Sequence, residues 1–516
     1  MKYGVRRTFG NRCLTIKTKK EMKKNLFMVA AVALMALVSC NKEEINGGEP
    51  QVQQPSYYVE FTASLEDDAT KTSYAADLKK TKWSEGDEIA VNGKKFKVTE
   101  LYEDGFSARF INVEELGENF GEPYTAVYPY NANENTTVIP AEQTVVDGSF
   151  AEEAVAAVAY SAEGNTLSFK NICSVIMFQV ATSGVTELEF ASNAALAGTI
   201  NVNVNNGADP TYTVASASNT IKVKPSGTSF DTNATYYVSV LPTLGAEGTK
   251  QTFEIKSEGV VVKSGNVTFK RSKVMNAKSI EVKYTYLKPN LVWNISSPRY
   301  AAYFFEGEAN IWVNMTDSDN DGVFRAVVPE GYTNLIYCRM NPKNTENRWN
   351  NSGESNGPLW NQSGDLKVPA DDKLAYIAGI MKWDASGSWD TLANAKSYRE
   401  NAVYLKPNSN WKQSNAWFAV YLCNGSKGTK WLKLTSVDGT FYGVELPSDF
   451  DATNYKNIIF VRMDSGKTAL DWGSKWNQSG DLACTKMTAS PYNRCCAINN
   501  GQWDCGSSVT WTTTLK

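Results

Sequence analysis

Aromatic, amide and guanidinium side chains recur as two matched sets in the C-terminal part of the chain. A flat aromatic ring packs well against the apolar C–H face of a sugar ring, and amide or guanidinium groups hydrogen-bond to the sugar hydroxyls with fixed geometry. This chemistry is binding without bond breaking, so we expect no catalytic residue in either set. The residues that we predict to bind carbohydrate are Tyr303, Trp312, Arg339, Trp349, Trp360 and Gln362 in the first set, and Tyr421, Trp431, Arg462, Trp472, Trp476 and Gln478 in the second.

The two sets belong to two copies of one domain. The motifs Tyr-Leu-Lys-Pro-Asn and Trp-Asn-Gln-Ser-Gly-Asp-Leu each occur twice, beginning at Tyr286 and Tyr404 and at Trp360 and Trp476. Each copy is about a hundred residues long, which is an ordinary domain size. We place the first repeat at residues 286–392 and the second repeat at residues 403–516, and all of the 14 tryptophans except Trp83 lie in this part of the chain.

The period of the sequence predicts which way these rings point. Successive side chains alternate between the two faces of a β-strand. In the strand at residues 311–315 the odd-numbered side chains form an apolar core face, so Trp312 points away from the core. The same alternation places Tyr303 outward, and the second repeat agrees at Tyr421 and Trp431. Outward aromatics of this kind favour a binding surface, because they are costly unless something covers them.

A third matched strand in each repeat carries the arginine. We assign Ile336, Cys338 and Met340 to the core face of this strand. Arg339 then lies on the outward face beside the rings, and Arg462 does so in the second repeat. The loop tryptophans of the two sets can either join the rings or plug the core, and the sequence leaves both open. Four other tryptophans are expected to pack in the core or at its edge, because large aromatics are often simply buried. These are Trp293, Trp383, Trp411 and Trp503.

Composition excludes several kinds of site. The chain contains no histidine, which rules out nucleophiles activated by histidine and metals bound by histidine. Residues 1–39 are strongly basic, so the rest of the chain is acidic and is predicted not to bind nucleic acid. The acidic run at residues 317–322 resembles the start of a calcium loop, but its twelfth position is Val328 rather than glutamate. We interpret it as a hairpin turn, and we predict no metal, no cofactor and no enzymatic activity.

The order of these features resembles a starch-binding carbohydrate-binding module of family 26. The shared features are the opening Tyr-Leu-Lys-Pro-Asn, a tyrosine before a hairpin, a tryptophan after it, and the Trp-Asn-Gln loop. The resemblance implies a β-sandwich that binds α-1,4-glucan through an aromatic cradle. One position departs from the pattern: family members commonly carry a second aromatic two residues before the tyrosine, where this chain has Ala301 and Ala419. Two weak sites on one chain still bind a polymer well through effective concentration.

Residues 56–285 are predicted to form β-sandwiches. Alternating stretches such as residues 58–63 and 175–180 are typical of strands, and Asn-Gly turns separate such stretches. The predicted fold class is therefore all-β, with several β-sandwich domains. The sequences Phe-Thr-Ala at 61–63 and Trp-Ser-Glu-Gly-Asp-Glu-Ile at 83–89 resemble fimbrillin-like (Mfa-like) domains. This resemblance implies two stacked sandwiches carried on a lipid anchor.

The first 39 residues are predicted to be a signal peptide. Lys23 and Lys24 precede an apolar run that is too short for a membrane span. The Leu-Val-Ser-Cys that ends this run resembles a bacterial lipobox, which implies cleavage before Cys40 and attachment of lipid to it. Residues 40–55 are predicted to be a flexible tether. The expected location is the outer membrane, with the protein anchored by lipid and exposed on the cell surface.

These features support two functional hypotheses. In the first, a lipid-anchored surface protein binds starch, maltooligosaccharides or related α-glucan without catalysis through its two repeats. The alternative is a fimbrial accessory or tip adhesin that recognises host glycans or a pilus subunit. A glycan array separates the two, because a preference for host sugars over maltooligosaccharides favours the alternative.

Overall fold

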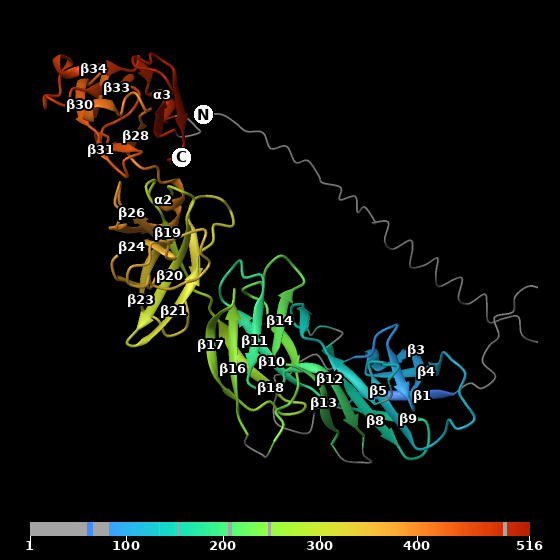
Figure 1. Ribbon diagram of the computed structural model, residues 1–516. Helices are drawn as coiled ribbons and strands as arrows, with labels where there is room; N and C mark the ends of the chain where they lie inside the picture. Colours follow the sequence, from blue (N-terminus) through green and yellow to red (C-terminus); the bar gives the residue numbers. More distant parts are fainter. Residues whose placement is uncertain are drawn as a thin grey trace, which may run out of the picture. The chain divides into compact units, whose positions relative to one another are not determined.

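The regular secondary structure of the described residues is almost entirely β-strand, as the computed structural model in Figure 1 shows, and this confirms the predicted all-β class. The structure describes residues 59–65, 82–133, 135–149, 151, 154–204, 209–245, 249–488 and 493–516. The predicted signal peptide, the lipidation residue Cys40 and the tether lie outside these residues. Within the described part of the chain, no helix has the length and apolar character needed to cross a membrane.

The first strands close into a barrel rather than an open sandwich. In barrel order they are β1 (Glu60–Leu65), β4 (Ser107–Asn112), β3 (Lys94–Tyr102), β2 (Glu88–Val91), β5 (Tyr124–Tyr128), β8 (Ala157–Ser161) and β9 (Thr166–Asn171). Closure occurs because β1 pairs antiparallel with β4 on one side and parallel with β9 on the other. Trp83 is buried in this barrel, with its ring centroid 5.0 Å from that of Phe110 and 5.3 Å from that of Phe169.

The next strands form three sheets around a common core. The first sheet has the order β15 (Tyr236–Val240), β10 (Ser174–Val180) and β18 (Val274–Ile280). The second has the order β17 (Val260–Val267), β16 (Gln251–Ser257), β11 (Leu188–Ser192), β14 (Thr220–Pro225) and β7 (Glu142–Val145). The third has the order β13 (Thr211–Ser218), β12 (Ala197–Asn203) and β6 (Thr136–Ile139). Phe178 and Phe190 are buried between them with ring centroids 5.2 Å apart. In β11, Leu188 and Phe190 are buried while Glu189 between them is partly exposed, whereas every residue of β15 is buried.

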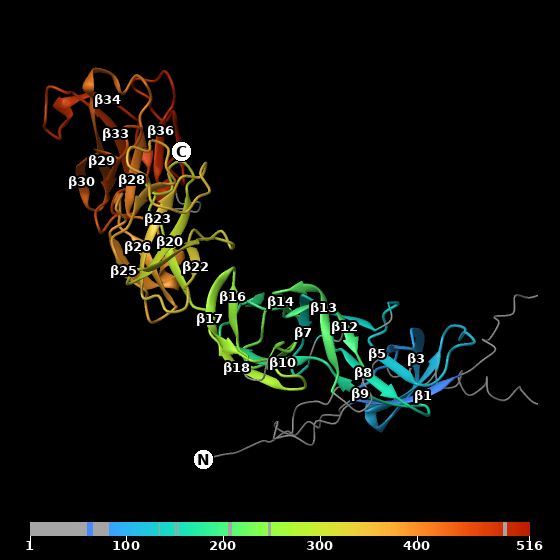
Figure 2. The same cartoon turned by 60° about the horizontal axis from the view of Figure 1, so that its bottom comes forward.

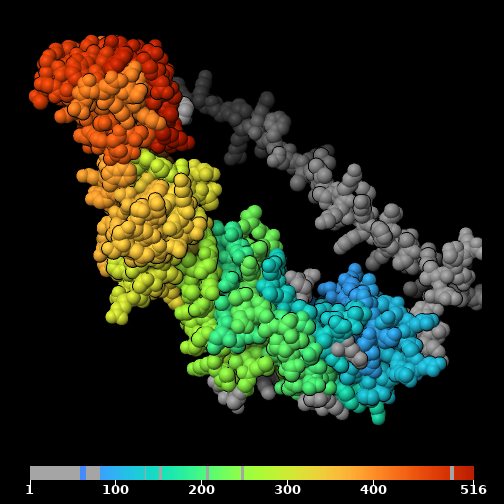
Figure 3. Space-filling model, viewed as in Figure 1, coloured from blue at the N-terminus to red at the C-terminus, as the bar shows by residue number. Residues whose placement is uncertain are grey.

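The first repeat is a sandwich of two sheets. One sheet has the order β22 (Phe324–Val327), β19 (Tyr284–Lys288), β26 (Leu374–Ala378) and β27 (Gly387–Thr391). The other, which we call the first aromatic sheet, has the order β21 (Ala309–Asn314), β20 (Arg299–Glu306), β23 (Asn334–Met340) and β24 (Leu359–Gln362), and β25 (Leu366–Lys367) also pairs with β23. The helix α2 (Leu392–Ser397) follows β27. In the space-filling view of Figure 3, the yellow and orange atoms of this repeat form one closely packed body.

The second repeat has the same plan. One sheet has the order β31 (Thr435–Ser436), β32 (Tyr442–Glu445), β28 (Ala402–Lys406), β36 (Cys495–Ile498) and β37 (Val509–Thr512). The second aromatic sheet has the order β30 (Gly428–Lys433), β29 (Trp417–Gly425), β33 (Asn457–Met463) and β34 (Lys475–Gln478), and β35 (Leu482–Ala483) also pairs with β33. Figure 2 shows β29, β30 and β33 side by side. The short helix α3 (Thr485–Thr488) follows β35.

The repeats match down to single hydrogen bonds in the core. Trp293 and Trp411 are fully buried, as predicted. The indole N–H of Trp293 donates to the carbonyl of Trp383 at 2.8 Å, and that of Trp411 donates to the carbonyl of Trp503 at 2.7 Å. A buried indole N–H needs such a partner, so each pair ties the loop after the first strand to the end of its repeat.

Candidate functional site

Three aromatic rings meet on the outer face of the first aromatic sheet. We call Tyr303, Trp312 and Trp349 the first aromatic cluster. The ring centroids of Tyr303 and Trp312, of Tyr303 and Trp349, and of Trp312 and Trp349 are each 4.9 Å apart. The rings are inclined to one another by 57° to 66°, so they line an angled surface rather than a flat stack. All three remain partly exposed.

The second repeat builds the same arrangement from Tyr421, Trp431 and Trp472, the second aromatic cluster. Each of its three centroid distances is 4.8 Å. Trp472 is 41% exposed, so the cluster opens to solvent. Two copies that have diverged over most of their length therefore keep one three-ring geometry, and each cluster gathers residues predicted from the sequence.

Strand pairing and a loop position the rings. Tyr303 on β20 is paired directly with Trp312 on β21, and Tyr421 on β29 with Trp431 on β30. Directly paired residues point to the same face of a sheet. The alternate residues Ala302 and Phe304, and Val420 and Leu422, are buried in the cores of the repeats, which confirms the outward direction that the alternation predicts. The third ring comes from the loop that joins β23 to β24, or β33 to β34.

Hydrogen bonds hold the loop that carries Trp349. Arg299 on β20 donates from its Nε to the carbonyl of Asn344 at 2.8 Å and from an Nη to the side-chain oxygen of Asn347 at 2.5 Å. The guanidinium of Arg348 makes two bonds of 2.8 Å to the two carboxylate oxygens of Glu354. This pairing lowers the pKa of Glu354 to about 2, because the bidentate contact stabilises the charged carboxylate.

The face predicted for the third strand is wrong. Ile336 and Cys338 on β23 are paired with Tyr303 and Ala301 on β20, so they lie on the aromatic face and not on the core face. Together with Met340 and Ala301 they form a buried floor beneath the first aromatic cluster. In the second repeat the floor consists of Ala419, Cys423, Ile459, Val461 and Met463. The rings cover this face, so both faces of the strand are apolar and alternation of hydrophobicity cannot mark its phase.

Arg339 and Arg462 consequently lie on the opposite face from the aromatic clusters, which corrects the predicted position. They are 6% and 4% exposed. Arg339 donates to the carbonyls of Trp293 and Ile295 and to the side chain of Asn361. Arg462 donates to the carbonyls of Trp411 and Gln413 and to the side chain of Asn477. Burial lowers the pKa of both guanidinium groups, and their bonds hold the loop that follows the first strand of each repeat.

The predicted loop residues divide between the two faces. Trp360 and Trp476 lie over Arg339 and Arg462, with each guanidinium carbon 4.5 Å from the ring centroid, and thus away from the clusters. Gln362 is paired with Cys338 of the floor, so it lies on the aromatic face. Gln478 is paired with Val461 in the same way. The amides of Gln362 and Gln478 are therefore the predicted polar groups that share a face with the rings.

Two aromatic residues of this face were not predicted. Phe305 stacks on Tyr303 with ring centroids 5.9 Å apart and an angle of 25°. Trp417 packs with Tyr421 and Trp431 over the floor of the second repeat. Both lie an even number of residues from the tyrosine on the same strand, so the alternation that located the tyrosines contains the signal for them as well.

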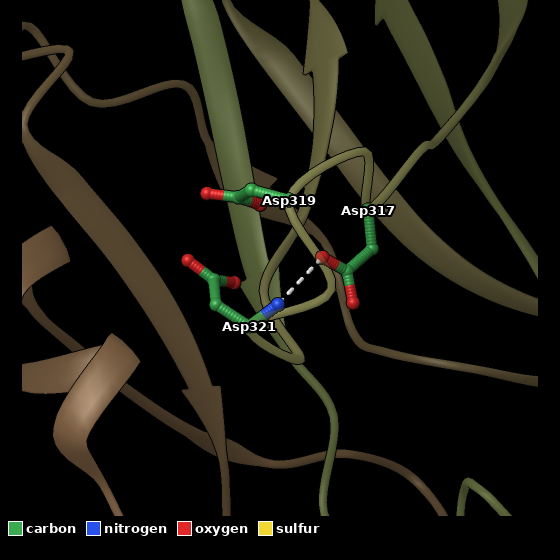
Figure 4. Close-up of side chains that lie close together, drawn as sticks. All are labelled: Asp317, Asp319 and Asp321. Atoms are coloured by element: carbon green, nitrogen blue, oxygen red, sulfur yellow. Dashed lines mark hydrogen bonds between the residues drawn. The ribbon is translucent and has the colours of Figure 1, made fainter.

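The acidic run of the first repeat folds as a compact turn, shown in Figure 4. The backbone N–H of Asp321 donates to a carboxylate oxygen of Asp317 at 3.1 Å. Carboxylate oxygens of Asp317, Asp319 and Asp321 come close enough together to hold a metal ion. The ammonium of Lys396, from α2, lies 2.8 Å from Asp319 and 2.5 Å from Asp321 and supplies the countercharge. This contact lowers the pKa of Asp319 and raises that of Lys396.

Comparisons with known proteins add similarity of structure at a low level. No family model matches the chain, and no curated protein matches it. A crystal structure from Bacteroides uniformis, described as a candidate cell adhesion protein, shares 17% identity over 44% of this chain and 94% of its own, with a TM-score of 0.25. A fimbrial protein from Bacteroides ovatus shares 13% identity over 44% of this chain and 51% of its own, with a TM-score of 0.22.

A fimbrial assembly protein from Parabacteroides distasonis shares 13% identity over 53% of this chain and all of its own, with a TM-score of 0.23. Similarities this low assign neither a family nor a function to the chain. The two aromatic clusters are the sites that both repeats share.

Proposed function

We propose that this protein binds carbohydrate without catalysis through its two aromatic clusters, with starch, maltooligosaccharides or related α-glucan as the ligand. The observation that carries the proposal is the repetition of one three-ring geometry at 4.8–4.9 Å on two sheets. In the first repeat the third ring, that of Trp349, lies in an irregular loop. In the second repeat the third ring belongs to Trp472, the first residue of the 3₁₀ helix η5 (Trp472–Ser474). Two loops of different conformation therefore put an indole at the same position of the cluster. This is expected when evolution has conserved the position of the ring rather than the conformation of the loop.

The chemistry of the clusters fits sugar rather than a purely apolar ligand. Inclined rings that stay partly exposed offer several faces for the C–H surfaces of successive sugar units. Gln362 and Gln478, on the same faces, supply amide donors and acceptors for hydroxyl groups. The motif order that resembles family 26 modules supports α-1,4-glucan as the sugar. In the same proposal, Cys40 anchors the protein to outer-membrane lipid at the cell surface, and loss of membrane association in Cys40→Ala is the corresponding measurement.

Titration calorimetry of the full chain with maltoheptaose tests the proposal. We expect binding by the natural chain and a loss of about 5- to 150-fold at each cluster in the double variant Trp312→Ala with Trp431→Ala, because each change removes a stacking ring worth about 1–3 kcal/mol from its own cluster. The matched control is Trp503→Ala, which removes an indole that is 42% exposed but belongs to neither cluster. No binding by a folded natural chain, or equal loss in the control, contradicts the proposal.

A second candidate function is adhesion, in which the chain is a fimbrial accessory or tip protein that recognises host glycans or a pilus subunit. Its support is the fimbrillin-like motifs of the N-terminal region, whose aromatic residues Phe61 and Trp83 are buried barrel residues. On this view the same clusters would bind host sugars. A glycan array with the full chain decides between the two, since maltooligosaccharide preference supports the first candidate and host-glycan preference supports the second.

A further inference from the structure

The two aromatic clusters differ in the charges that border them. In the second repeat, Lys433 is paired with Ala419 of the floor and Lys475 with Met463 of the floor, so both side chains lie on the aromatic face. The ammonium of Lys433 is 4.9 Å from the ring centroid of Trp417. That of Lys475 is 5.6 Å from the ring centroid of Trp472 and donates to the amide oxygen of Gln478 at 2.8 Å.

The first repeat has neutral residues at both positions. Asn314 occupies the place of Lys433, and its side-chain oxygen accepts a bond of 3.0 Å from the amide of Asn347. Leu359 occupies the place of Lys475 and packs against the cluster. The cations that lie near the first cluster are bonded within the repeat: Arg299 holds the loop that carries Trp349, and Arg348 is paired with Glu346 and Glu354. Lys367, on the aromatic face beside Phe305, donates to the side-chain oxygen of Asn334 at 2.6 Å.

The ammonium groups of Lys433 and Lys475 have N–H donors available for a ligand. Each lysine has three N–H donors, and in the described residues no carboxylate lies within ion-pair distance of either ammonium group. The acidic side chains of the neighbouring loops accept backbone N–H groups instead. These acceptors are Asp464 from Gly466 at 2.8 Å, Asp471 from Ser474 at 2.8 Å, and Asp504 from Gln478 at 3.0 Å.

We propose that the second repeat prefers anionic carbohydrate, in which a carboxylate or sulfate group on the sugar contacts Lys433 or Lys475, while the first repeat takes neutral carbohydrate. The inference rests on the proposed function, because it concerns the same ring clusters. A sugar stacked on Tyr421, Trp431 and Trp472 brings its substituents to the border of the cluster, where both ammonium groups lie. An ion pair there adds to stacking and does not replace it.

Calorimetry of the full chain carrying Trp312→Ala isolates the second repeat. The probes are maltoheptaose, maltoheptaose carboxylated at C6, and maltoheptaose sulfated at O6, which share one backbone. We expect an anionic probe whose charged group reaches the two ammonium groups to bind about tenfold more tightly than the neutral probe at low salt. This ratio of affinities is the one expected for two partly exposed ion pairs. The difference should shrink as salt is added, because ions screen exposed charges.

Variants identify the groups responsible. Lys433→Met with Lys475→Met should bring the ratio of anionic to neutral affinity close to one, because methionine keeps much of the apolar side chain and removes the charge. The matched control is Lys430→Met in the same hairpin, since Lys430 is paired with Leu422 and points to the opposite face from Trp431. It should leave the ratio unchanged.

The outcomes separate this inference from the proposed function. A preference for the carboxylated probe alone or for the sulfated probe alone supports the inference and identifies the anionic group. Equal affinity for neutral and anionic probes overturns the inference and leaves the proposed function standing. A preference that survives in the double lysine variant also overturns it. If the folded natural chain, with both clusters intact, binds none of the three probes, the proposed function itself fails.

Discussion

At the scale of single residues, the position of one indole depends on one carboxylate. Glu354 accepts both bonds from Arg348 and a further bond of 2.9 Å from the backbone N–H of Asn351. These contacts close the loop on which Trp349 projects toward Tyr303 and Trp312. The cluster therefore relies on an ion pair that is not itself part of the ring surface.

Glu354→Gln should weaken binding by the first repeat at neutral pH by on the order of two- to fivefold, the range for an exposed ion pair. The pKa of Glu354 is lowered to about 2 in the folded chain, from an ordinary 4.5. A lowered pKa means that its contribution is present above pH 4.5 and is lost as the pH falls through about 2. Binding by the first repeat should decline in that window, and the Glu354→Gln variant should lack this part of the decline.

The measurement is maltoheptaose titration in a chain carrying Trp431→Ala, so that only the first repeat responds. Glu308→Gln, at an exposed glutamate near the β20–β21 hairpin, is the control. Unchanged affinity in Glu354→Gln together with an unchanged pH profile would show that the Trp349 loop is held without this pair.

At the scale of elements, the buried arginine of each aromatic sheet is a structural brace. Arg339 and Arg462 join β23 and β33 to the loop after the first strand of their repeats, through the carbonyls of Trp293 and Trp411. Trp360 and Trp476 cover the guanidinium planes. A planar group with several donors suits this role, and a lysine cannot reproduce it.

Arg339→Lys should therefore lower the free energy of unfolding by about 2–4 kcal/mol, because buried carbonyl oxygens lose charged partners. Maltoheptaose affinity, measured well below the unfolding transition, should stay close to that of the natural chain. Chemical denaturation followed by tryptophan fluorescence measures the first quantity. Arg399→Lys, at an exposed position, is the control. Lost affinity with unchanged stability would instead place Arg339 in the binding site.

At the scale of the whole molecule, the chain offers two clusters to a polymer that repeats its own units. Once one cluster has bound, the other acts at an effective concentration set by the connection between them. Trp312→Ala or Trp431→Ala alone should therefore reduce affinity for amylopectin by on the order of a hundredfold or more if both clusters engage one molecule. The per-site affinity of the remaining cluster for maltoheptaose should not change. A loss of only about twofold for the polymer would show that the clusters act independently.

The sequence by itself determined the all-β class, the duplication and the outward direction of four rings. Trp312 and Trp431 share the outer face of their strands with the polar residues Asn314 and Lys433, so a period of two marks that face. Tyr303 and Tyr421 follow from the same alternation in the preceding strand. It also predicted that Trp293 and Trp411 pack in the core, because large aromatics are often buried. These features are local, because each depends on neighbours within one or two strands.

Only the tertiary structure decided the composition of the sites. The strands β23 and β33 are apolar on both faces, because rings from other elements cover the outer one, so their phase depends on pairing with β20 and β29. Trp349 and Trp472 reach the clusters from loops. Trp360 and Trp476 point to the opposite face, because a bulge interrupts the pairing of β23 with β24 and of β33 with β34. Side chains brought together by long-range pairing leave no periodic signal in the chain, and that is the physical reason why two arginines were assigned to the wrong face.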